Sequence, residues 1–233
     1  MNNTDKNATL YLVPTPIGNL DDITIRALKV LNEVDIIACE DTRHSGILFK
    51  HHNINYKKLD SYHEHNEKEK SDYLITQILS GLSVGLVTDA GSPGISDPAY
   101  RLVKKALENN INIVALPGAT AFVPALTASG LSVDAFKFVG FPPNKKGRQT
   151  FLKGIITERS TLIMYESPYR IIKLVEELIT LGCENRQICI ARELTKIHEE
   201  FIRGTCTEVL EIIKKHQYLK GEFAVILEGS KQN

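Results

Sequence analysis

Charged residues gather where short apolar runs end. Residues 40–43 (Glu-Asp-Thr-Arg) follow the apolar run 35–39, and residues 191–200 place five charged side chains among ten positions beside another apolar run. Carboxylates can accept a proton from a weak nucleophile. Such a density of charge beside a buried strand favours a functional site over a plain turn in residues 191–200. For residues 40–43 a second interpretation stays open, in which Asp41 or Thr42 caps the next helix and Arg43 pairs with a carboxylate.

Loops rich in glycine and proline follow three other apolar runs, at residues 14–22, 88–97 and 117–121. Glycine and proline let the backbone turn sharply and come close to a ligand. The sequence contains neither G-x-G-x-x-G nor G-x-x-x-x-G-K-[ST], the loops that hold nucleotide phosphates. These loops therefore predict a pocket built from backbone, which suits a medium-sized organic ligand better than a metal.

Three aspartates in these loops are interpreted separately. Asp22 is predicted to cap a helix that begins at Ile23. Asp97 is predicted to cap a helix that has Pro98 at its first position. Asp89 has no such structural role in the pattern, so we expect it to contact a ligand or to order its loop.

The histidines and cysteines form no recognisable metal site. The pairs His51-His52 and His63-x-His65 lack a cysteine or carboxylate at zinc-finger or zincin spacing. We interpret them as polar loop histidines, with a substrate contact by His65 as an alternative, and we expect no metal. The four cysteines are scattered, so they predict neither a disulfide framework nor a zinc site.

One local patch of this chain is basic, although the whole chain is neutral. The sequence has 28 Lys or Arg and 28 Asp or Glu, so a global field that attracts polyanions is not expected. Residues 142–173 carry seven Lys or Arg against two Glu, part of which a solvated helix face explains. The Pro- and Gly-rich loop in this segment is suited to touch phosphates. The candidate RNA-binding residues are Lys145, Lys146, Arg148 and Arg170.

Strand and helix patterns alternate along the chain, in a composition typical of globular proteins. We predict two α/β domains, residues 1–118 around a mostly parallel sheet and residues 119–233 around a mixed sheet with an antiparallel pair within 188–203. No apolar run approaches 18 residues, so we predict a soluble, cytoplasmic protein without a membrane span. The predicted strands are 9–13, 35–39, one near 56–60, 84–88, 111–116, 136–139, 161–165, 188–192, 200–203 and 222–227, and the predicted helices are 23–32, 68–80, 98–109, 149–157, 168–181 and 207–215.

Several segments, in this order along the chain, resemble the tetrapyrrole methylase superfamily. Two further segments, YESP at 165–168 and ARELTK at 191–196, make the chain similar within it to the family of small-subunit ribosomal RNA methyltransferases I. The similarity runs from about residue 9 to residue 229. The segments that carry the broader resemblance are VPTPIGNL at 13–20, CEDTRH at 39–44, TDAGSPGISDP at 88–98 and LPG at 116–118.

The resemblance implies two α/β domains of the tetrapyrrole methylase type, with S-adenosylmethionine in the cleft between them and usually a homodimer. It implies methyl transfer to the ribose 2′-oxygen of a cytidine in the decoding centre of 16S rRNA, within the small ribosomal subunit. Carried over residue by residue, it implies cofactor contacts from Pro16, Gly18, Asp89, Gly91, Ser92, Pro93, Ile95, Thr120, Ala121, Tyr165 and Ala191.

Methyl transfer to a ribose hydroxyl needs a group that removes or shares its proton, and it needs no metal. We expect this base, together with the groups that position the ribose and its phosphates, among the charged residues at the cleft. Lys196 could serve as the base only if burial lowered its pKa, whereas a carboxylate is ready at neutral pH. The candidate catalytic residues are Glu40, Asp41, Arg43, Glu166, Glu193 and Lys196.

Two other functions stay open at this point. A tetrapyrrole C-methyltransferase of the same fold would need an open apolar trough and has little use for the basic loop at residues 145–148. A non-catalytic RNA-binding or ribosome-assembly module would contact phosphates without binding a cofactor. The charge-dense strand ends beside loops of small residues favour an enzyme.

Overall fold

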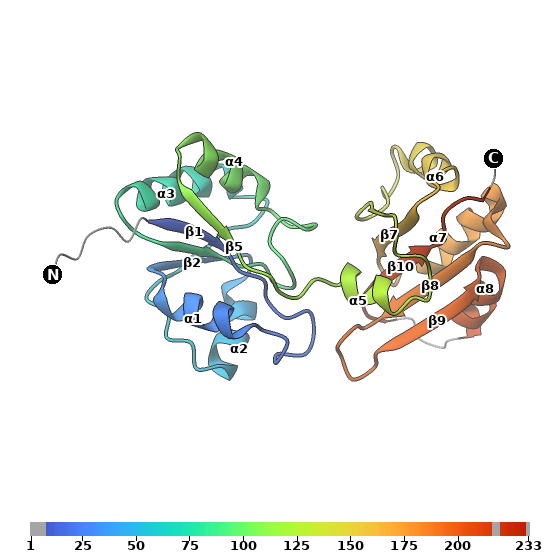
Figure 1. Ribbon diagram of the computed structural model, residues 1–233, viewed down its shortest axis with the longest axis horizontal. Helices are drawn as coiled ribbons and strands as arrows, with labels where there is room; N and C mark the ends of the chain where they lie inside the picture. Colours follow the sequence, from blue (N-terminus) through green and yellow to red (C-terminus); the bar gives the residue numbers. More distant parts are fainter. Residues whose placement is uncertain (1–7, 216–219, 232–233) are drawn as a thin grey trace. The chain divides into compact units, whose positions relative to one another are not determined.

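The chain divides into two units, Met1–Thr120 and Ala121–Asn233. The computed structural model describes residues 8–215 and 220–231, and each unit contains its own five-stranded sheet (Figure 1). The division lies two residues beyond the end of the predicted first domain at residue 118. None of the helices in the described ranges is long and apolar enough to cross a membrane.

The sheet of the first unit is entirely parallel, with the strand order β3-β2-β4-β1-β5. Parallel neighbours need long crossover connections, and a helix lies in each of them. Figure 1 shows α3 and α4 on one side of this sheet and α1 and α2 on the other. The strands are β1 (Thr9–Leu12), β2 (Ile36–Cys39), β3 (Leu59–Ser61), β4 (Val84–Leu86) and β5 (Asn112–Ala115), and the helices are α1 (Ile25–Glu33), α2 (Thr42–His51), α3 (Glu67–Leu79) and α4 (Tyr100–Glu108).

The side chains of β2 explain why both faces of this sheet are covered. Ile36 and Ala38 are buried in a hydrophobic cluster with residues of α3 and α4, whereas Ile37 and Cys39 are buried in another with residues of α1 and α2. Successive side chains of a strand point to opposite faces. A strand that is apolar at every position is therefore stable only between two helical layers. Full burial of one such side chain stabilises the fold by about 1.5–3 kcal/mol.

The second unit has a mixed sheet with the strand order β6-β7-β10-β8-β9. β6 and β7 are parallel, and the other neighbouring pairs are antiparallel. The predicted antiparallel pair within residues 188–203 is confirmed as β8 and β9. One hydrophobic cluster joins β7, β8 and β10 to α6, α7 and α8. The strands are β6 (Phe136–Phe138), β7 (Thr161–Glu166), β8 (Gln187–Arg192), β9 (Glu200–Thr205) and β10 (Phe223–Leu227), and the helices are α5 (Phe122–Thr127), α6 (Arg148–Ile156), α7 (Ile171–Leu178), a π-helical turn (Ile179–Cys183) and α8 (Cys206–Lys215).

Two predicted helix caps are wrong. The cap of α1 is Thr24, whose hydroxyl accepts a hydrogen bond from the backbone N–H of Ala27 at 3.1 Å, so Asp22 does not cap this helix. The helix α4 begins at Tyr100 and has no side-chain cap, so Asp97 does not cap it. Several polar residues near a helix start can serve as a cap, and the backbone conformation of the loop decides which one does.

The loop after β5 packs closely against the loop after β1. A Cβ atom on Gly118 would lie 2.5 Å from the Cβ atom of Pro14, which is closer than real Cβ atoms approach other atoms. Residue 118 is therefore glycine because there is no room for a Cβ atom beside Pro14. The close approach holds together the chain segments that leave the adjacent strands β1 and β5.

We expect Gly118→Ala to lower the free energy of unfolding by about 1–3 kcal/mol, because the added methyl group overlaps Pro14. Urea denaturation measures this change. Gly46→Ala is the matched control, since Gly46 lies in α2 with no atom within 4 Å of an added Cβ. Alanine is favoured over glycine inside a helix by roughly 0.5–1 kcal/mol, so this control should be more stable than wild type. A Gly118→Ala variant as stable as wild type would contradict the close packing.

Candidate functional site

Two loops at the carboxyl edge of the parallel sheet are joined by backbone hydrogen bonds. Thr15, after β1, and Gly91, after β4, exchange both N–H···O bonds, each 2.9 Å long. The Thr15 hydroxyl also donates to the carbonyl of Thr88 at 2.9 Å. Gly91 has a φ of +87°, a conformation that favours glycine. The two loops therefore form one continuous structure at the edge where open α/β sheets bind ligands.

The loop after β5 is attached to the same structure through Ser92. The Ser92 hydroxyl donates to the carbonyl of Ala119 at 2.9 Å. The Thr120 hydroxyl in turn donates to the Ser92 hydroxyl at 3.0 Å. Three predicted cofactor contacts, Gly91, Ser92 and Thr120, are thereby brought together. Of the other predicted contacts in this unit, Gly18 is exposed, Asp89, Pro93 and Ile95 are partly exposed, and Pro16 is buried.

Three carboxylates, Glu40, Asp89 and Asp97, lie near Thr88 at this edge, and we call them the carboxylate group. The Thr88 hydroxyl donates to Glu40 Oε2 at 3.0 Å, and Asp89 Oδ1 accepts from the backbone N–H of Asp41 at 3.1 Å. Burial and then the charge of Glu40 raise the pKa of Asp97 to about 6, against the opposing effect of a hydrogen bond with Thr88. Burial also raises the pKa of Asp89. Raised carboxyl pKa values are typical of groups that exchange protons at neutral pH.

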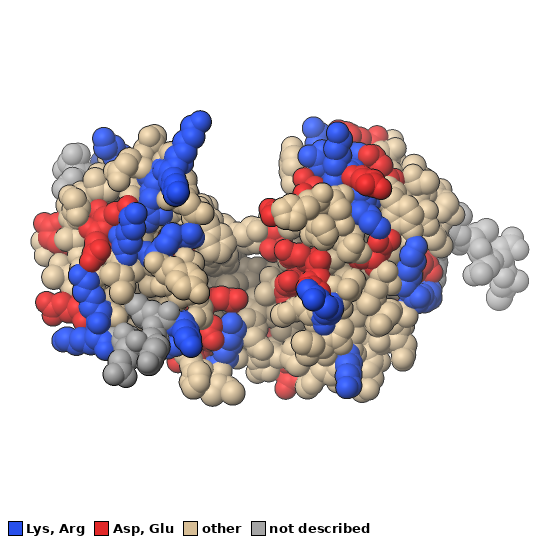
Figure 2. Space-filling model, turned by 180° about the vertical axis from the view of Figure 1, so that it is seen from behind, with Lys and Arg blue, Asp and Glu red and all other residues tan. Residues whose placement is uncertain are grey.

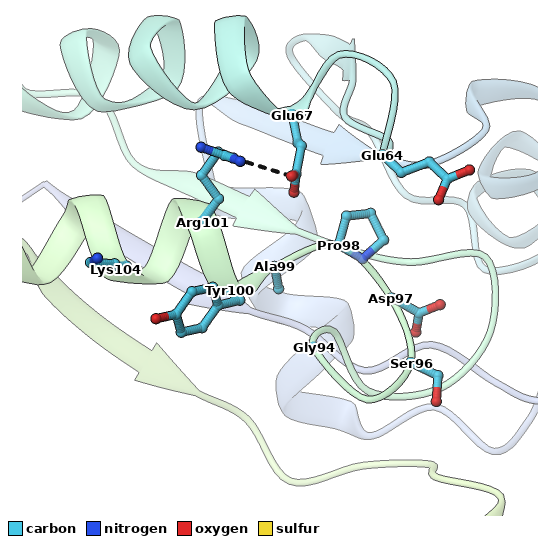
Figure 3. Close-up of a pocket in the computed structure, with 10 residues that line it drawn as sticks. All are labelled: Glu64, Glu67, Gly94, Ser96, Asp97, Pro98, Ala99, Tyr100, Arg101 and Lys104. Atoms are coloured by element: carbon cyan, nitrogen blue, oxygen red, sulfur yellow. Dashed lines mark hydrogen bonds and ion pairs between the residues drawn. The ribbon is translucent and has the colours of Figure 1, made fainter. Parts of the chain in front are cut away.

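Asp97 is not among the site residues predicted from the sequence, because the Asp97-Pro98 pattern suggests a helix cap. The signal that could have found it is its position, since Asp97 lies in the same loop after β4 as Asp89. Asp97 also borders a pocket of about 560 Å³ beside the N-terminal ends of α3 and α4 (Figure 3). In this pocket Arg101 Nε donates to Glu67 Oε1 at 3.1 Å, so two of its charges are paired.

Asp41 is a helix cap, which confirms the structural interpretation of this residue. Its Oδ1 accepts from the backbone N–H of Arg43 at 2.8 Å, and its Oδ2 lies 2.7 Å from Arg43 Nη2. The hydrogen bonds from Arg43 hold the pKa of Asp41 well below its usual range. These contacts favour a structural role for Asp41, and its predicted catalytic role stays a prediction. The Arg43 side chain is 89% exposed, and its predicted role in positioning a phosphate stays a prediction.

Glu166 is an ion-pair residue, and its prediction as a catalytic group is wrong. Its side chain has no exposed surface, and its Oε1 accepts from Arg170 Nε at 2.8 Å. Arg148 Nη1 lies 3.7 Å from its Oε2, while Arg148 Nη2 binds Glu177 at 2.6 Å. A carboxylate buried between two guanidinium groups is not accessible to a substrate hydroxyl.

Arg148 is only 4% exposed, so the prediction that it contacts RNA is wrong. Its Nη1 donates to the carbonyl of Pro143 at 3.1 Å and thereby anchors the loop before α6. Lys145 and Lys146 in this loop are exposed and stay candidate phosphate contacts, whereas Arg170 is partly exposed and already paired. Basic and acidic side chains are intermixed on the face of the molecule in Figure 2, so we expect any RNA contact of these lysines to be local.

Lys196 cannot serve as a neutral base. Its Nζ donates to Glu193 at 2.9 Å and to Glu222 at 3.2 Å. Desolvation alone would lower the pKa of Lys196, but these carboxylates outweigh it and raise the pKa above its usual value. Glu193 also accepts the backbone N–H of Glu222 at 3.0 Å, and both Glu193 and Thr195 have positive φ angles. Glu193 and Lys196 are thus bound to each other and to Glu222, and their predicted catalytic roles stay predictions.

The three predicted cofactor contacts in the second unit, Ala121, Tyr165 and Ala191, differ in exposure. Tyr165 is partly exposed, its hydroxyl accepts from the backbone N–H of Phe122 at 3.1 Å, and its ring packs against Phe138. Ala191 is 1% exposed inside β8, so it has no free surface for a ligand. The contacts of Tyr165 and of the partly exposed Ala121 with a cofactor stay predictions.

A family model of the tetrapyrrole (corrin/porphyrin) methylases matches residues 9–210. The chain belongs to the tetrapyrrole methylase family. A relative named ribosomal RNA small subunit methyltransferase I in Halalkalibacterium halodurans is 47% identical to this methylase, over 97% of this chain and 78% of that protein. Proteins of the same name are 46% identical in Escherichia coli O157:H7, over 95% and 78% of the two chains, and 46% identical in Hydrogenobaculum sp., over 96% of each. These identities confirm the narrower resemblance.

Solved methylase structures share the fold. A cobalt precorrin-4 methyltransferase has a TM-score of 0.70 at 18% identity, over 94% of each chain. A uroporphyrin-III C-methyltransferase from Thermus thermophilus, complexed with S-adenosylhomocysteine, has a TM-score of 0.64 at 19% identity, over 94% of this chain and 97% of that one. The predicted fold class, two α/β domains of the tetrapyrrole methylase type, is confirmed.

We expect Asp97→Asn to change how the stability of this methylase depends on pH. Because the pKa of Asp97 is raised from 3.8 to about 6, the folded state binds a proton more tightly than the unfolded state. The contribution of Asp97 to the stability of wild type should therefore fall as the pH rises from about 4 to about 6. The variant has no carboxylate to ionise inside the fold. Its free energy of unfolding at neutral pH should therefore exceed that of wild type by about 1–2 kcal/mol after allowance for solvent screening.

Urea denaturation at a series of pH values measures this difference. Asp22→Asn, at an exposed aspartate of the same unit, is the control and should follow wild type. An Asp97→Asn variant that is less stable than wild type at neutral pH would contradict the raised pKa.

Proposed function

We propose that this methylase transfers a methyl group from S-adenosylmethionine to the ribose 2′-oxygen of a cytidine in the decoding centre of 16S rRNA. The observation that carries the proposal is its 44–47% identity, over nearly the whole chain, to curated proteins named ribosomal RNA small subunit methyltransferase I. The substrate is then the RNA of the small ribosomal subunit, encountered in the cytoplasm. A homodimer belongs to the same proposal and rests on the resemblance alone.

The carboxyl edge of the first unit's sheet fits this cofactor. S-adenosylmethionine supplies a methyl group on a positively charged sulfur, and nearby carboxylates favour such a charge. Gly91 and Gly118 have no side chains of their own, so the loop after β4 bonds to the loop after β1 and the loop after β5 packs directly on Pro14. Asp89 and Thr120 are the polar side chains that we expect to hold the cofactor, with Ser92 orienting Thr120.

The reaction is a displacement in which the ribose oxygen bonds to the methyl carbon while the carbon–sulfur bond breaks. The enzyme must align the incoming oxygen with that bond, which contributes about 7–11 kcal/mol in favourable cases. The ribose hydroxyl loses its proton, and we propose Glu40 as the acceptor. Thr88 orients the Glu40 carboxylate, and Asp97 lies close enough for the two charges to interact.

Labelled methyl transfer from S-adenosylmethionine to unmodified small ribosomal subunits tests the proposal. After nuclease digestion, the label should be in 2′-O-methylcytidine. Glu40→Gln should slow single-turnover transfer by roughly 100-fold or more, because an amide cannot accept the proton. Calorimetry should show that this variant binds S-adenosylmethionine as wild type does.

Glu69→Gln, at an exposed carboxylate of α3, is the control and should keep the wild-type rate. A Glu40→Gln variant with the wild-type rate would remove Glu40 as the base but leave the methyltransferase proposal intact. Label that enters a precorrin but no RNA would support the tetrapyrrole alternative. A chain that binds small-subunit RNA but no S-adenosylmethionine would instead be a binding module.

Lys145→Ala and Lys146→Ala should weaken binding to small-subunit RNA without changing which sequence is preferred. Each lysine is exposed in the loop anchored by Arg148. Loss of one phosphate contact should reduce the salt slope of log K by about 1. Filter binding at several salt concentrations measures the slope. Lys29→Ala, at an exposed lysine of α1, is the control, and an unchanged slope in both loop variants would exclude this loop as an RNA contact.

A further inference from the structure

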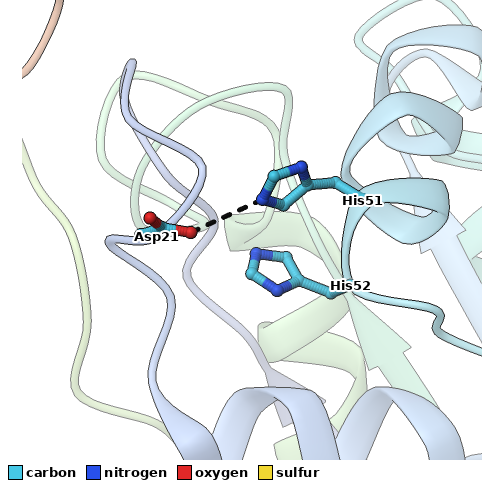
Figure 4. Close-up of side chains that lie close together, drawn as sticks. All are labelled: Asp21, His51 and His52. Atoms are coloured by element: carbon cyan, nitrogen blue, oxygen red, sulfur yellow. Dashed lines mark hydrogen bonds and ion pairs between the residues drawn. The ribbon is translucent and has the colours of Figure 1, made fainter.

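Asp21, His51 and His52 converge at the C-terminal end of α2 (Figure 4). Asp21 lies in the loop between β1 and α1, and the two histidines end α2. Each residue offers one ligand atom, and these atoms all lie within 4.8 Å of one another. Figure 4 shows both imidazole rings directed from the helix toward the segment that carries Asp21. In the part of the chain that the structure describes, this is the one such group of three potential metal ligands.

One distance within this group fits two ligands of a shared ion. His51 Nε2 lies 3.4 Å from Asp21 Oδ1, which is long for a hydrogen bond. Two ligands of a tetrahedral zinc ion with bonds of about 2.1 Å are themselves about 3.4 Å apart. The observed distance therefore equals one edge of such a tetrahedron.

His52 lies beside Asp21 and His51. Its Nε2 lies 2.8 Å from the carbonyl oxygen of Leu20, the residue before Asp21, so this nitrogen is a hydrogen-bond donor here and binds an ion only in the tautomer that carries the proton on Nδ1. The two imidazole rings meet edge to face, with centroids 4.7 Å apart, so neither ring blocks the other. The C-terminal end of a helix carries partial negative charge, which favours a cation there.

We propose that Asp21, His51 and His52 bind one divalent transition-metal ion of the zinc class. Two imidazoles and one carboxylate are ligands that zinc uses in proteins, and three protein ligands leave the fourth position to water. The side chains of Asp21 and His51 are 79% and 47% exposed, so an ion reaches them directly from solvent. The ion would link the loop that carries Pro16 and Gly18 to the end of α2. It would take no part in methyl transfer.

Calorimetric titration of the untagged full chain with Zn²⁺ tests this site. We expect one ion per chain in wild type and at least roughly tenfold weaker binding in His51→Gln/His52→Gln, since both imidazole ligands are lost. The matched control is His63→Gln/His65→Gln, which removes the other close histidine pair of this unit and should bind as wild type does. Bound Co²⁺ should give the visible absorption of a tetrahedral site in wild type and in the control.

Asp21→Asn keeps the test decisive if the double histidine variant fails to fold, because Asp21 is mostly exposed. This variant should also bind Zn²⁺ at least roughly tenfold more weakly than wild type. The site is overturned if wild type binds no ion, if Asp21→Asn binds as wild type does, or if the His63/His65 control loses binding to the same extent. None of these readouts depends on methyltransferase activity.

Discussion

The reciprocal hydrogen bonds between Thr15 and Gly91 hold the candidate site together. Thr15 is 3% exposed, so its backbone N–H and C=O have little access to water and need partners inside the protein. The partner is a residue with a φ of +87°, where a side chain would be strained. One backbone constraint thereby determines where Asp89 and Ser92 lie. The backbone hydrogen bonds between Thr15 and Gly91 therefore position the side chains at this edge of the sheet.

The first loop is held at a second point further along the chain. The Leu20 carbonyl lies 2.8 Å from His52 Nε2, at the end of α2. Residues 16–19, which include the predicted cofactor contacts Pro16 and Gly18, therefore lie between two anchored positions. A loop anchored at both ends loses less conformational entropy when a ligand binds, so this arrangement favours binding.

Charged residues have different roles in the two units. In the second unit, Arg148, Arg170, Glu166 and Glu177 neutralise one another, and removal of one member would leave an uncompensated charge beside the buried Glu166. In the first unit, Glu40 and Asp89 accept hydrogen bonds from a hydroxyl and a backbone N–H, and their charges act on Asp97. Like charges kept close together lower stability, and such arrangements are concentrated at functional sites.

The sequence by itself determined the strands, most of the helices and the edge of the sheet where chemistry is expected, whereas α2 and α5 were not among the predicted helices. The unbroken apolar run of β2 requires helices on both faces, and the glycines of residues 88–97 and 117–121 indicate close backbone approach. These properties are local, since they depend on residues within one strand or one turn. The tertiary structure alone decided the partners of the polar side chains. Arg148 meets Glu177 across 29 residues, and Asp21 meets His51 across 30. The sequence does not show whether a charged or imidazole side chain is buried in an ion pair, open to a substrate or close to other metal ligands. Its role depends on groups that folding brings from distant segments.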